Sequence, residues 1–193
     1  MRICVFGAAS PKIDKEYIEL VEYMGEELAR RGHCLVFGGG GNGLMGAAAR
    51  GFTMGGGHIL GIIPSFFENE EIEAVYPHCD EIIETVTMRE RKQLMEDNSD
   101  AFIIVPGGIG TFEEFFEVMT LRQLCRHNKP IALYNIKGYY NELEAMMKAG
   151  VEKGFIRSAC DDLYKTTDNF EELVEFIETP QPENQLVKDL KDG

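Results

Sequence analysis

Short apolar runs alternate with longer amphipathic stretches along almost the whole chain. The runs that predict strands cover residues 3–6, 33–37, 58–63, 81–86, 101–105, 131–134 and 163–166. The run at 101–105 is continuously apolar, which is typical of a strand that is buried on both faces. This alternation predicts βαβ units, and therefore an α/β fold with a mainly parallel sheet flanked by helices.

Helices are expected in the stretches where apolar residues recur at helical spacing. These stretches cover residues 14–32, 44–54, 88–97, 111–126, 139–153 and 169–177. Residues 65–80 are acidic with weak periodicity, so we expect a loop there with one short helix at most. We expect one domain over residues 1–180 and a charged tail over 181–193, because no linker or repeat divides the chain.

The acidic composition narrows the range of partners. The chain has 193 residues, with 19 Lys and Arg against 33 Asp and Glu, so its formal net charge is −14. That balance disfavours nucleic acid as a partner, because binding to nucleic acid depends on Lys and Arg that neutralise phosphates. A small phosphorylated ligand that is held by a few local groups is compatible with the negative net charge. No apolar run approaches the roughly 20 residues of a membrane helix. Residues 1–10 lack the order of a signal peptide, so we expect a cytoplasmic protein without membrane contact.

The cysteines and histidines point to neither disulfides nor a metal. The five cysteines are scattered along the chain at Cys4, Cys34, Cys79, Cys125 and Cys160. None of them forms a CxxC pair, so we expect reduced thiols, most of them buried. The four histidines form no HExxH motif and no other close pair of ligands, so no metal is expected.

The first candidate for a binding site is a glycine-rich turn after a predicted strand. In an open parallel sheet, ligands bind beyond the carboxyl ends of the strands. Residues 37–46 read Phe-Gly-Gly-Gly-Gly-Asn-Gly-Leu-Met-Gly, and glycines there allow backbone amides to approach a phosphate at a helix N-terminus. The candidate ligands are Gly39, Gly40 and Gly43. The turn also matches GxGxxG, but the next strand ends without the acidic residue that would bind an adenosine ribose. The alternative is structural: a tight turn with a close helix contact.

A second glycine-rich turn follows the buried strand at 101–105. Residues 106–114 read Pro-Gly-Gly-Ile-Gly-Thr-Phe-Glu-Glu, in which the glycines can cradle a phosphate and Thr111 can cap the next helix. Two carboxylates follow in the first helical turn, where the helix dipole alone would explain one of them. Because helix neighbours lie about 100° apart, we expect one of Glu113 and Glu114 to face the site and the other to point away.

A cluster of cations lies where a predicted strand ends and a helix begins. Arg89, Arg91 and Lys92 are three cations within four residues of an acidic chain. The helix dipole mildly opposes cations near a helix start, so this placement points to an anionic ligand. The alternative is a solvated helix face whose cations pair with acids such as Glu96. The chain contains no Walker loop and no GxSxG elbow.

Together these motifs resemble the LOG family, the cytokinin riboside 5′-monophosphate phosphoribohydrolases, whose members also carry the older label of lysine decarboxylase. Residues 106–114 match the family's PGGxGTxxE, and residues 38–46 resemble its GGGxxGLMG. Arg91 and Lys92 resemble the Arg-Lys of its MHxRK element, and the similarity extends to about residue 178. The resemblance implies a Rossmann-like, doubly wound α/β domain, usually dimeric, with its site near the dimer contact.

The resemblance also implies roles for particular residues. Arg91 and Glu114 correspond to the catalytic pair. The residues that would line the nucleotide are Lys92, Gly107, Gly108, Ile109, Gly110, Thr111, Glu113 and Thr120. Met88, Phe112 and Phe115 are available for an apolar pocket around the base, with the core as the alternative place for each. Arg89 replaces the family's usual histidine and Leu121 its usual tryptophan, which leaves the base preference open.

The implied reaction is hydrolysis of the N-glycosidic bond of an adenosine 5′-monophosphate, with or without an N6-prenyl group, to the free base and ribose 5-phosphate. Cleavage builds oxocarbenium-like charge on the ribose, which a carboxylate such as Glu114 stabilises. The phosphate would rest on the glycine turns, and Arg91 would orient the ribose or phosphate or assist the leaving base. No cofactor is expected, because no lysine adjoins a phosphate turn in a motif that would hold pyridoxal phosphate.

Two other classes of function stay open. A non-catalytic nucleotide-binding protein could be built on the same glycine turns. A nicotinamide-linked oxidoreductase is disfavoured by the missing ribose-binding acid.

We expect a homodimer, from the family and from the apolar residues of the helix predicted over 111–126.

Overall fold

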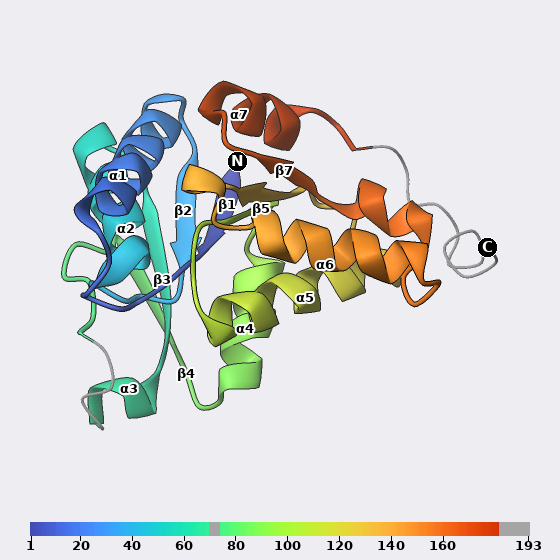
Figure 1. Cartoon of the computed structure of the whole chain (residues 1–193). Coiled ribbons are helices and arrows are strands. Elements are labelled where there is room, and N and C mark those ends of the chain that lie inside the picture. The colour runs from blue at the N-terminus through green and yellow to red at the C-terminus, as the bar shows by residue number, and fades with distance from the viewer. Residues whose placement is uncertain (70–73, 182–193) are drawn as a thin grey trace.

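The computed structural model describes residues 1–69 and 74–181 and contains a sheet of seven parallel strands (Figure 1). The strands are β1 Arg2–Phe6, β2 Cys34–Phe37, β3 Ile59–Pro64, β4 Glu81–Thr85, β5 Ala101–Ile104, β6 Ile131–Tyr134 and β7 Lys165–Thr167. Their order in the sheet is β4-β3-β2-β1-β5-β6-β7. The predicted α/β fold with a parallel sheet is therefore confirmed.

Helices cover both faces of this sheet (Figure 1). One face carries α1 Lys15–Arg30, α2 Gly43–Gly55 and α7 Phe170–Glu178. The other face carries α4 Met88–Asp97, α5 Ile109–Gln123 and α6 Asn141–Glu152. The short elements are α3 Ser65–Asn69 and the 3₁₀ turns η1 Ile136–Gly138 and η2 Ser158–Leu163.

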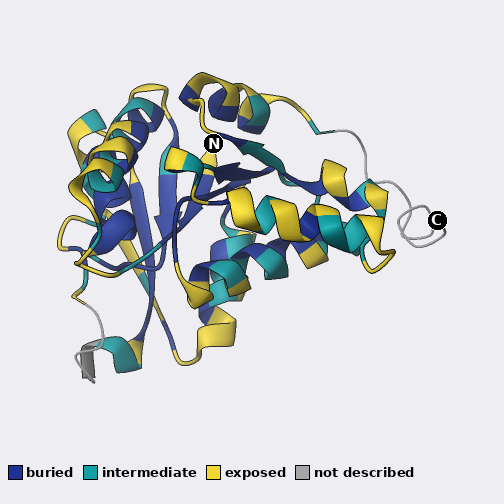
Figure 2. Cartoon of the chain, viewed as in Figure 1, coloured by how far each residue is buried: buried dark blue, intermediate teal, exposed yellow. Residues whose placement is uncertain are grey.

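The core lies in two layers because successive side chains of a strand point to opposite faces of the sheet. In β1, Ile3 and Val5 pack beneath α1, α2 and α7, whereas Cys4 and Phe6 pack beneath the helices of the other face. All of β5 is buried, as its continuous apolar run predicts, and Figure 2 shows the central strands as the buried middle of the molecule.

Small residues let α2 approach α1 closely. A Cβ atom at Gly51 of α2 would lie 2.2 Å from the carbonyl oxygen of Glu22 in α1, well inside van der Waals contact. The close neighbour of α2 is therefore another helix as well as the sheet.

The predicted elements match the structure in kind and order, and the main additions are η1 and η2, which lack the length for a periodic pattern. The helix expected over 111–126 begins at Ile109 with Gly108 as its N-cap, so the expectation that Thr111 caps it is wrong. Part of the acidic segment, residues 70–73, and nearly all of the expected tail, residues 182–193, lie outside the described residues. The five cysteines are in no disulfide, but only Cys4 and Cys160 are buried, so the expectation that most are buried is wrong. Within residues 1–69 and 74–181, no helix is long and apolar enough to cross a membrane.

Candidate functional site

A cleft of about 380 Å³ lies between the ends of β1 and β5. The strand order reverses there, because β2, β3 and β4 extend to one side of β1 whereas β5, β6 and β7 extend to the other. Connections leave toward opposite faces at such a point, and the two strand ends open a crevice between them. The residues that line the cleft are Gly7, Ala8, Ala9, Ser10, Met45, Met88, Arg91, Gly108, Gly110, Thr111, Glu113 and Glu114.

The second glycine-rich turn brings the N-terminus of α5 to this cleft. Gly108 is the N-cap residue, and the first backbone bond of the helix runs from the amide of Phe112 to the carbonyl of Gly108, at 3.0 Å. In the described part of the chain, the amides of residues 108–111 have no backbone acceptor. These amides carry the partial positive charge of the helix dipole, so the arrangement suits an anionic group.

Arg91 reaches the cleft from α4. Thr87 caps that helix, since its hydroxyl accepts a hydrogen bond from the amide of Glu90 at 3.1 Å. Arg91 is only 5% exposed, and its guanidinium lies 5.5 Å from the centre of the Phe67 ring. Among the described residues, its Nε–H has no hydrogen-bond partner. A buried donor that lacks a partner is costly, so this atom is suited to a ligand that supplies one.

Gly38, at the end of β2, makes room for this arginine. A Cβ atom at Gly38 would lie 1.6 Å from Nη2 of Arg91. The first glycine of the Gly38–Gly41 run therefore acts on the site through the position of the guanidinium, because any side chain there would displace it.

Glu114 faces the same cleft from the first turn of α5. Burial raises the pKa of its carboxyl to about 7, although Arg91 lowers it and the neighbouring Glu113 raises it. A carboxyl group with a pKa near neutrality can gain or lose a proton in the range where enzymes work. Glu113 also lines the cleft, so the expected separation of the two carboxylates is only partial.

The carboxylate of Glu113 is nevertheless turned toward Lys92. The ammonium of Lys92 forms ion pairs with Glu113 and, at 2.7 Å, with Glu117. Its side chain is 14% exposed and is absent from the lining of the cleft formed by the described residues. Lys92 thus ties α4 to α5, which sets the relative position of the helices that carry Arg91 and Glu114.

The first glycine-rich turn is packed, not open. A Cβ atom at Gly43 would lie 2.3 Å from the carbonyl oxygen of Ala8, and one at Gly39 would lie 2.3 Å from the side chain of Ile63. Both glycines have positive φ angles. Gly40 forms an isolated bridge with Val75. The geometry therefore gives Gly39, Gly40 and Gly43 a packing role, and none of them belongs to the lining of the cleft.

The remaining expected residues lie around the cleft in different ways. Gly107 is buried behind the turn, while Ile109 is 88% exposed at its tip. Thr120 is exposed on the later part of α5 and stays a prediction as a nucleotide contact. Met88 lines the cleft, but Phe115 is buried in the core and Phe112 packs against it, so neither offers an open apolar pocket.

Residues 7–10 and Met45 were not expected in the site. Residues 7–10 have the sequence Gly-Ala-Ala-Ser and follow β1, the strand that pairs with β5. Small residues directly after a first strand are the available signal, but they form no motif. Knowledge that β1 and β5 are neighbours is needed to recognise them.

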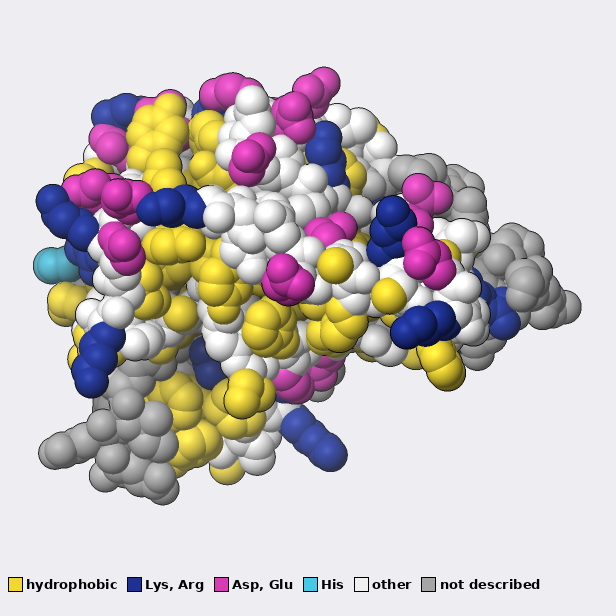
Figure 3. Space-filling model, in the orientation of Figure 1, with side chains coloured by type: hydrophobic (Ala, Val, Ile, Leu, Met, Phe, Trp, Pro, Cys, Tyr) yellow, Lys and Arg dark blue, Asp and Glu magenta, His cyan; other side chains and the backbone are white. Residues whose placement is uncertain are grey.

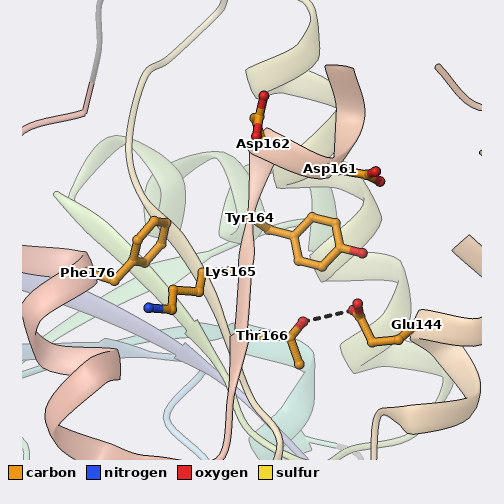
Figure 4. A pocket seen from close by; sticks show the side chains of 7 residues that line it. All are labelled: Glu144, Asp161, Asp162, Tyr164, Lys165, Thr166 and Phe176. Atoms are coloured by element: carbon orange, nitrogen blue, oxygen red, sulfur yellow. Dashed lines mark hydrogen bonds between the residues drawn. The ribbon is translucent and has the colours of Figure 1, made fainter. Parts of the chain in front are cut away.

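Two other cavities differ from this cleft in chemistry. A cavity of about 430 Å³ is lined by Glu144, Asp161 and Asp162 along with Tyr164, Lys165, Thr166 and Phe176 (Figure 4). The hydroxyl of Thr166 donates to Glu144 there, at 2.8 Å. Three acids against one lysine disfavour an anion. An apolar recess of about 270 Å³ lies behind the second turn, between Ile13, Tyr17, Leu44 and Tyr139.

The fold and the cleft define a class, a parallel α/β protein with three groups at the switch point of its sheet. These are helix amides with no backbone acceptor among the described residues, a buried arginine and a carboxyl of raised pKa. A family model described as "Possible lysine decarboxylase" matches residues 45–177. The chain belongs to this family, the LOG family.

Similar proteins support the assignment to the family. The chain is 39% identical over 186 residues to cytokinin riboside 5′-monophosphate phosphoribohydrolase LOG5 of Arabidopsis thaliana, covering 96% of this chain and 81% of that protein. It is 40% identical over 182 residues to LOG7 of the same plant, covering 94% and 83%. It also resembles the solved structure of TM1055, with a TM-score of 0.69, 22% identity and coverage of 92% and 98%, a likeness that concerns the fold alone.

Proposed function

We propose that the chain is a phosphoribohydrolase that cleaves the N-glycosidic bond of an adenosine 5′-monophosphate, with or without an N6-prenyl group. The products are the free base and ribose 5-phosphate. One observation carries the proposal: unpaired amides of α5, the buried Arg91 and the carboxyl of Glu114 all face one cleft. Two relatives about 40% identical to this chain are named as phosphoribohydrolases of this kind, which supports it.

Glu114 is proposed to stabilise the reacting ribose. As the bond between C1′ and the base breaks, positive charge develops on the ring, and a nearby carboxylate stabilises such charge. A water oxygen then bonds to C1′, one water proton leaves through the carboxylate, and a proton ends on the departing base. A carboxyl whose pKa is about 7 can take up and release that proton near neutral pH.

The helix N-terminus and Arg91 are proposed to hold the 5′-phosphate and the ribose. The amides of residues 108–111 and the Nε–H of Arg91 are donors without acceptors in the described part of the chain. A phosphate supplies oxygens for several of them at once. Binding energy from the phosphate, which does not react, positions C1′ beside Glu114.

The label of lysine decarboxylase fits the cleft poorly. Pyridoxal-dependent chemistry needs a lysine that forms a Schiff base within the site. The lining of the cleft formed by described residues includes no lysine. Lys92, which directly follows the cleft residue Arg91, donates to Glu113 and Glu117 instead.

A homodimer is also proposed. Most of the apolar residues of α5 on which that expectation rests pack in the chain's own core, including Phe115, Val118 and Met119. Exposed apolar side chains beside the cleft are a better candidate surface: Val86 is 75% exposed and Ile109 is 88% exposed. Figure 3 shows apolar side chains gathered over the region between α2 and α5. Light scattering tests the proposal, and a monomer at micromolar concentration would contradict it.

Replacement of Glu114 by Gln separates an enzyme from a nucleotide-binding protein. The two side chains have nearly the same shape, so binding of AMP should persist. We expect base release to fall about 10²- to 10⁴-fold, the usual range for loss of an acid–base group. A wild-type chain that binds AMP and releases no base would instead support the non-catalytic reading.

A further inference from the structure

The carbonyl groups of the second glycine-rich turn are held one after another. The carbonyl of Val105 accepts from the hydroxyl of Tyr140 at 2.7 Å, and that of Gly107 accepts from the hydroxyl of Tyr139 at 2.5 Å. Between them, the carbonyl of Pro106 accepts from the amide of Ala8 at 3.1 Å. The carbonyl oxygens of three successive residues, 105–107, therefore each have a donor.

Fixing the Gly107 oxygen also fixes where the amide of Gly108 points, whereas the Val105 oxygen precedes Pro106, which has no N–H, so Tyr140 fixes the start of the turn and not an amide. A trans peptide unit is planar, and its N–H points opposite to its C=O. Tyr139 lies with Gly107 and Gly108 in the lining of the apolar recess behind the turn. A Gly107 carbonyl bonded to Tyr139 therefore turns the Gly108 amide away from Tyr139, and Gly108 also lines the cleft. Two adjacent glycines would otherwise leave this peptide free to rotate.

The two tyrosines are in turn held by the segment that follows β6. Asn135 accepts from the amide of Tyr140 at 2.6 Å and donates to the side chain of Asn141 at 2.9 Å. Lys137 has a φ angle of 55°, which is unfavourable for a residue with a side chain, and Gly138 follows at 74°. Left-handed residues at this point reverse the chain directly before Tyr139.

The side chain of Lys137 contacts α1. Lys137 pairs with Glu16 of α1, and its ammonium lies 5.6 Å from the centre of the Tyr17 ring. Strain that the surroundings maintain is found most often at functional sites. Burial raises the pKa of Tyr140, so its hydroxyl stays protonated and remains a donor.

We infer that Tyr139 and Tyr140 are positioning residues that hold the turn so that its amides face the phosphate of the substrate. The inference rests on the proposed function, because it assigns those amides to a phosphate ester. Neither tyrosine lines the cleft in the described part of the chain, so both act through the turn and not by contact with the ligand.

The test compares Tyr139→Phe with Tyr134→Phe. Tyr134 is a buried tyrosine at the end of β6 that packs in the core layer opposite to that of Tyr140, so its loss controls for removal of a hydroxyl near the same strand. Two quantities are measured on the full chain: the Kd of ribose 5-phosphate by calorimetry and the hydrogen-exchange rate of the Gly108 amide by NMR. Tyr140→Phe is a second variant, with thermal unfolding recorded because it leaves the Val105 carbonyl without its tyrosine donor.

We expect Tyr139→Phe to raise the Kd of ribose 5-phosphate about 3- to 10-fold, as for loss of one hydrogen bond. The Gly108 amide should also exchange faster, while Tyr134→Phe changes neither quantity. Unchanged exchange and Kd in Tyr139→Phe, or equal changes in Tyr134→Phe, would overturn the inference. A wild-type chain that binds no ribose 5-phosphate would contradict the proposed function instead, and the exchange rate would still decide whether Tyr139 holds the turn.

Discussion

The two glycine-rich turns look alike in sequence and differ in what their helices do with the backbone amides. At the start of α2, the amides of Leu44 and Met45 both donate to the carbonyl of Ala8, at 2.7 and 3.4 Å. At the start of α5, the amides of residues 108–111 have no backbone acceptor within the described residues. The first helix uses its amide donors within the fold, whereas those of the second are open to the phosphate that we propose as their ligand.

The space around the glycines shows the same difference. Cβ atoms at Gly43 and Gly46 would lie 2.3 and 2.0 Å from backbone oxygens, so the fold itself requires glycine there. At Gly108 and Gly110, a Cβ atom would meet no heavy atom within 4 Å, and neither residue has a positive φ angle. Packing does not explain glycine at these two positions. Close approach of the proposed ligand to the backbone would explain it.

The largest expected effect comes from the packed turn. Gly43→Ala would place a methyl group 2.3 Å from the Ala8 oxygen at a residue whose φ angle is +59°. We expect it to lower the free energy of unfolding by about 3–5 kcal/mol, the range for a severe steric defect. Urea unfolding measures this loss.

Gly56→Ala is the matched control for that substitution. Gly56 also has a positive φ angle, +74°, but a Cβ atom there would meet nothing within 4 Å. Its cost should be limited to about 1–2 kcal/mol of backbone strain. Equal losses in the two variants would show that the close contact with Ala8 contributes nothing.

Gly38→Ala should affect activity more than stability, although Gly38 belongs to the first, packed turn. The new methyl group would meet Nη2 of Arg91, the end of a flexible side chain that can move. We expect stability to change by less than in Gly43→Ala, while kcat/KM for a nucleoside monophosphate falls about 10- to 100-fold as the guanidinium shifts. An unchanged kcat/KM would mean that the position of Arg91 is unimportant.

A pH dependence should arise from the second turn alone, because α2 has no acidic residue in its first turn. With a pKa of about 7 for Glu114, kcat/KM should fall roughly tenfold per pH unit below 7 and level off above it. A rate profile that is flat between pH 5 and 8 would contradict the role of this carboxylate.

The same group should affect stability with a predictable sign. Its pKa is higher in the folded chain than the ordinary value of 4.5, so the protonated form favours folding and stability falls as pH rises toward and through 7. Glu114→Gln should therefore be more stable than wild type at pH 8, by about 1–2 kcal/mol, and equally stable at pH 4. Urea unfolding at the two pH values measures the difference.

The smallest effect on the free energy of unfolding is expected from a substitution in the open turn, and its sign should be opposite to that of Gly43→Ala in the packed turn. Gly110→Ala adds a methyl group in free space within the first turn of α5. Alanine favours a helix over glycine, so unfolding should become harder by up to about 1 kcal/mol. The KM for a nucleoside monophosphate should rise several-fold, because the methyl group keeps the phosphate from the amides. A loss of stability with an unchanged KM would reverse the comparison.

Much of the fold could be predicted from the sequence because the strands of a parallel sheet read as short apolar runs. Glu114 and Arg91 could be assigned to a common site from their motifs, and both line one cleft. The loop at residues 7–10 could not, because its place depends on the pairing of β1 with β5, which local periodicity does not encode.

The roles of individual site residues were harder to predict. A glycine required by packing and a glycine required by a ligand are the same letter, so Gly43 and Gly110 could not be told apart before the surroundings of each were known. The ion pairs of Lys92 depend on how α4 lies against α5. The contact of Tyr139 with Gly107 joins residues 32 positions apart and depends on a 3₁₀ turn that has no periodic pattern.

The most direct test of the account is release of free base from AMP and from isopentenyladenosine 5′-monophosphate, with adenosine and isopentenyladenosine as matched controls. If the open turn binds the phosphate and thereby positions the ribose beside Glu114, the monophosphates should yield base and ribose 5-phosphate in equal amounts. The nucleosides should react with a kcat/KM at least about 100-fold lower, since they lack that binding energy. Equal rates for nucleosides and monophosphates, or no release from either monophosphate, would contradict the account.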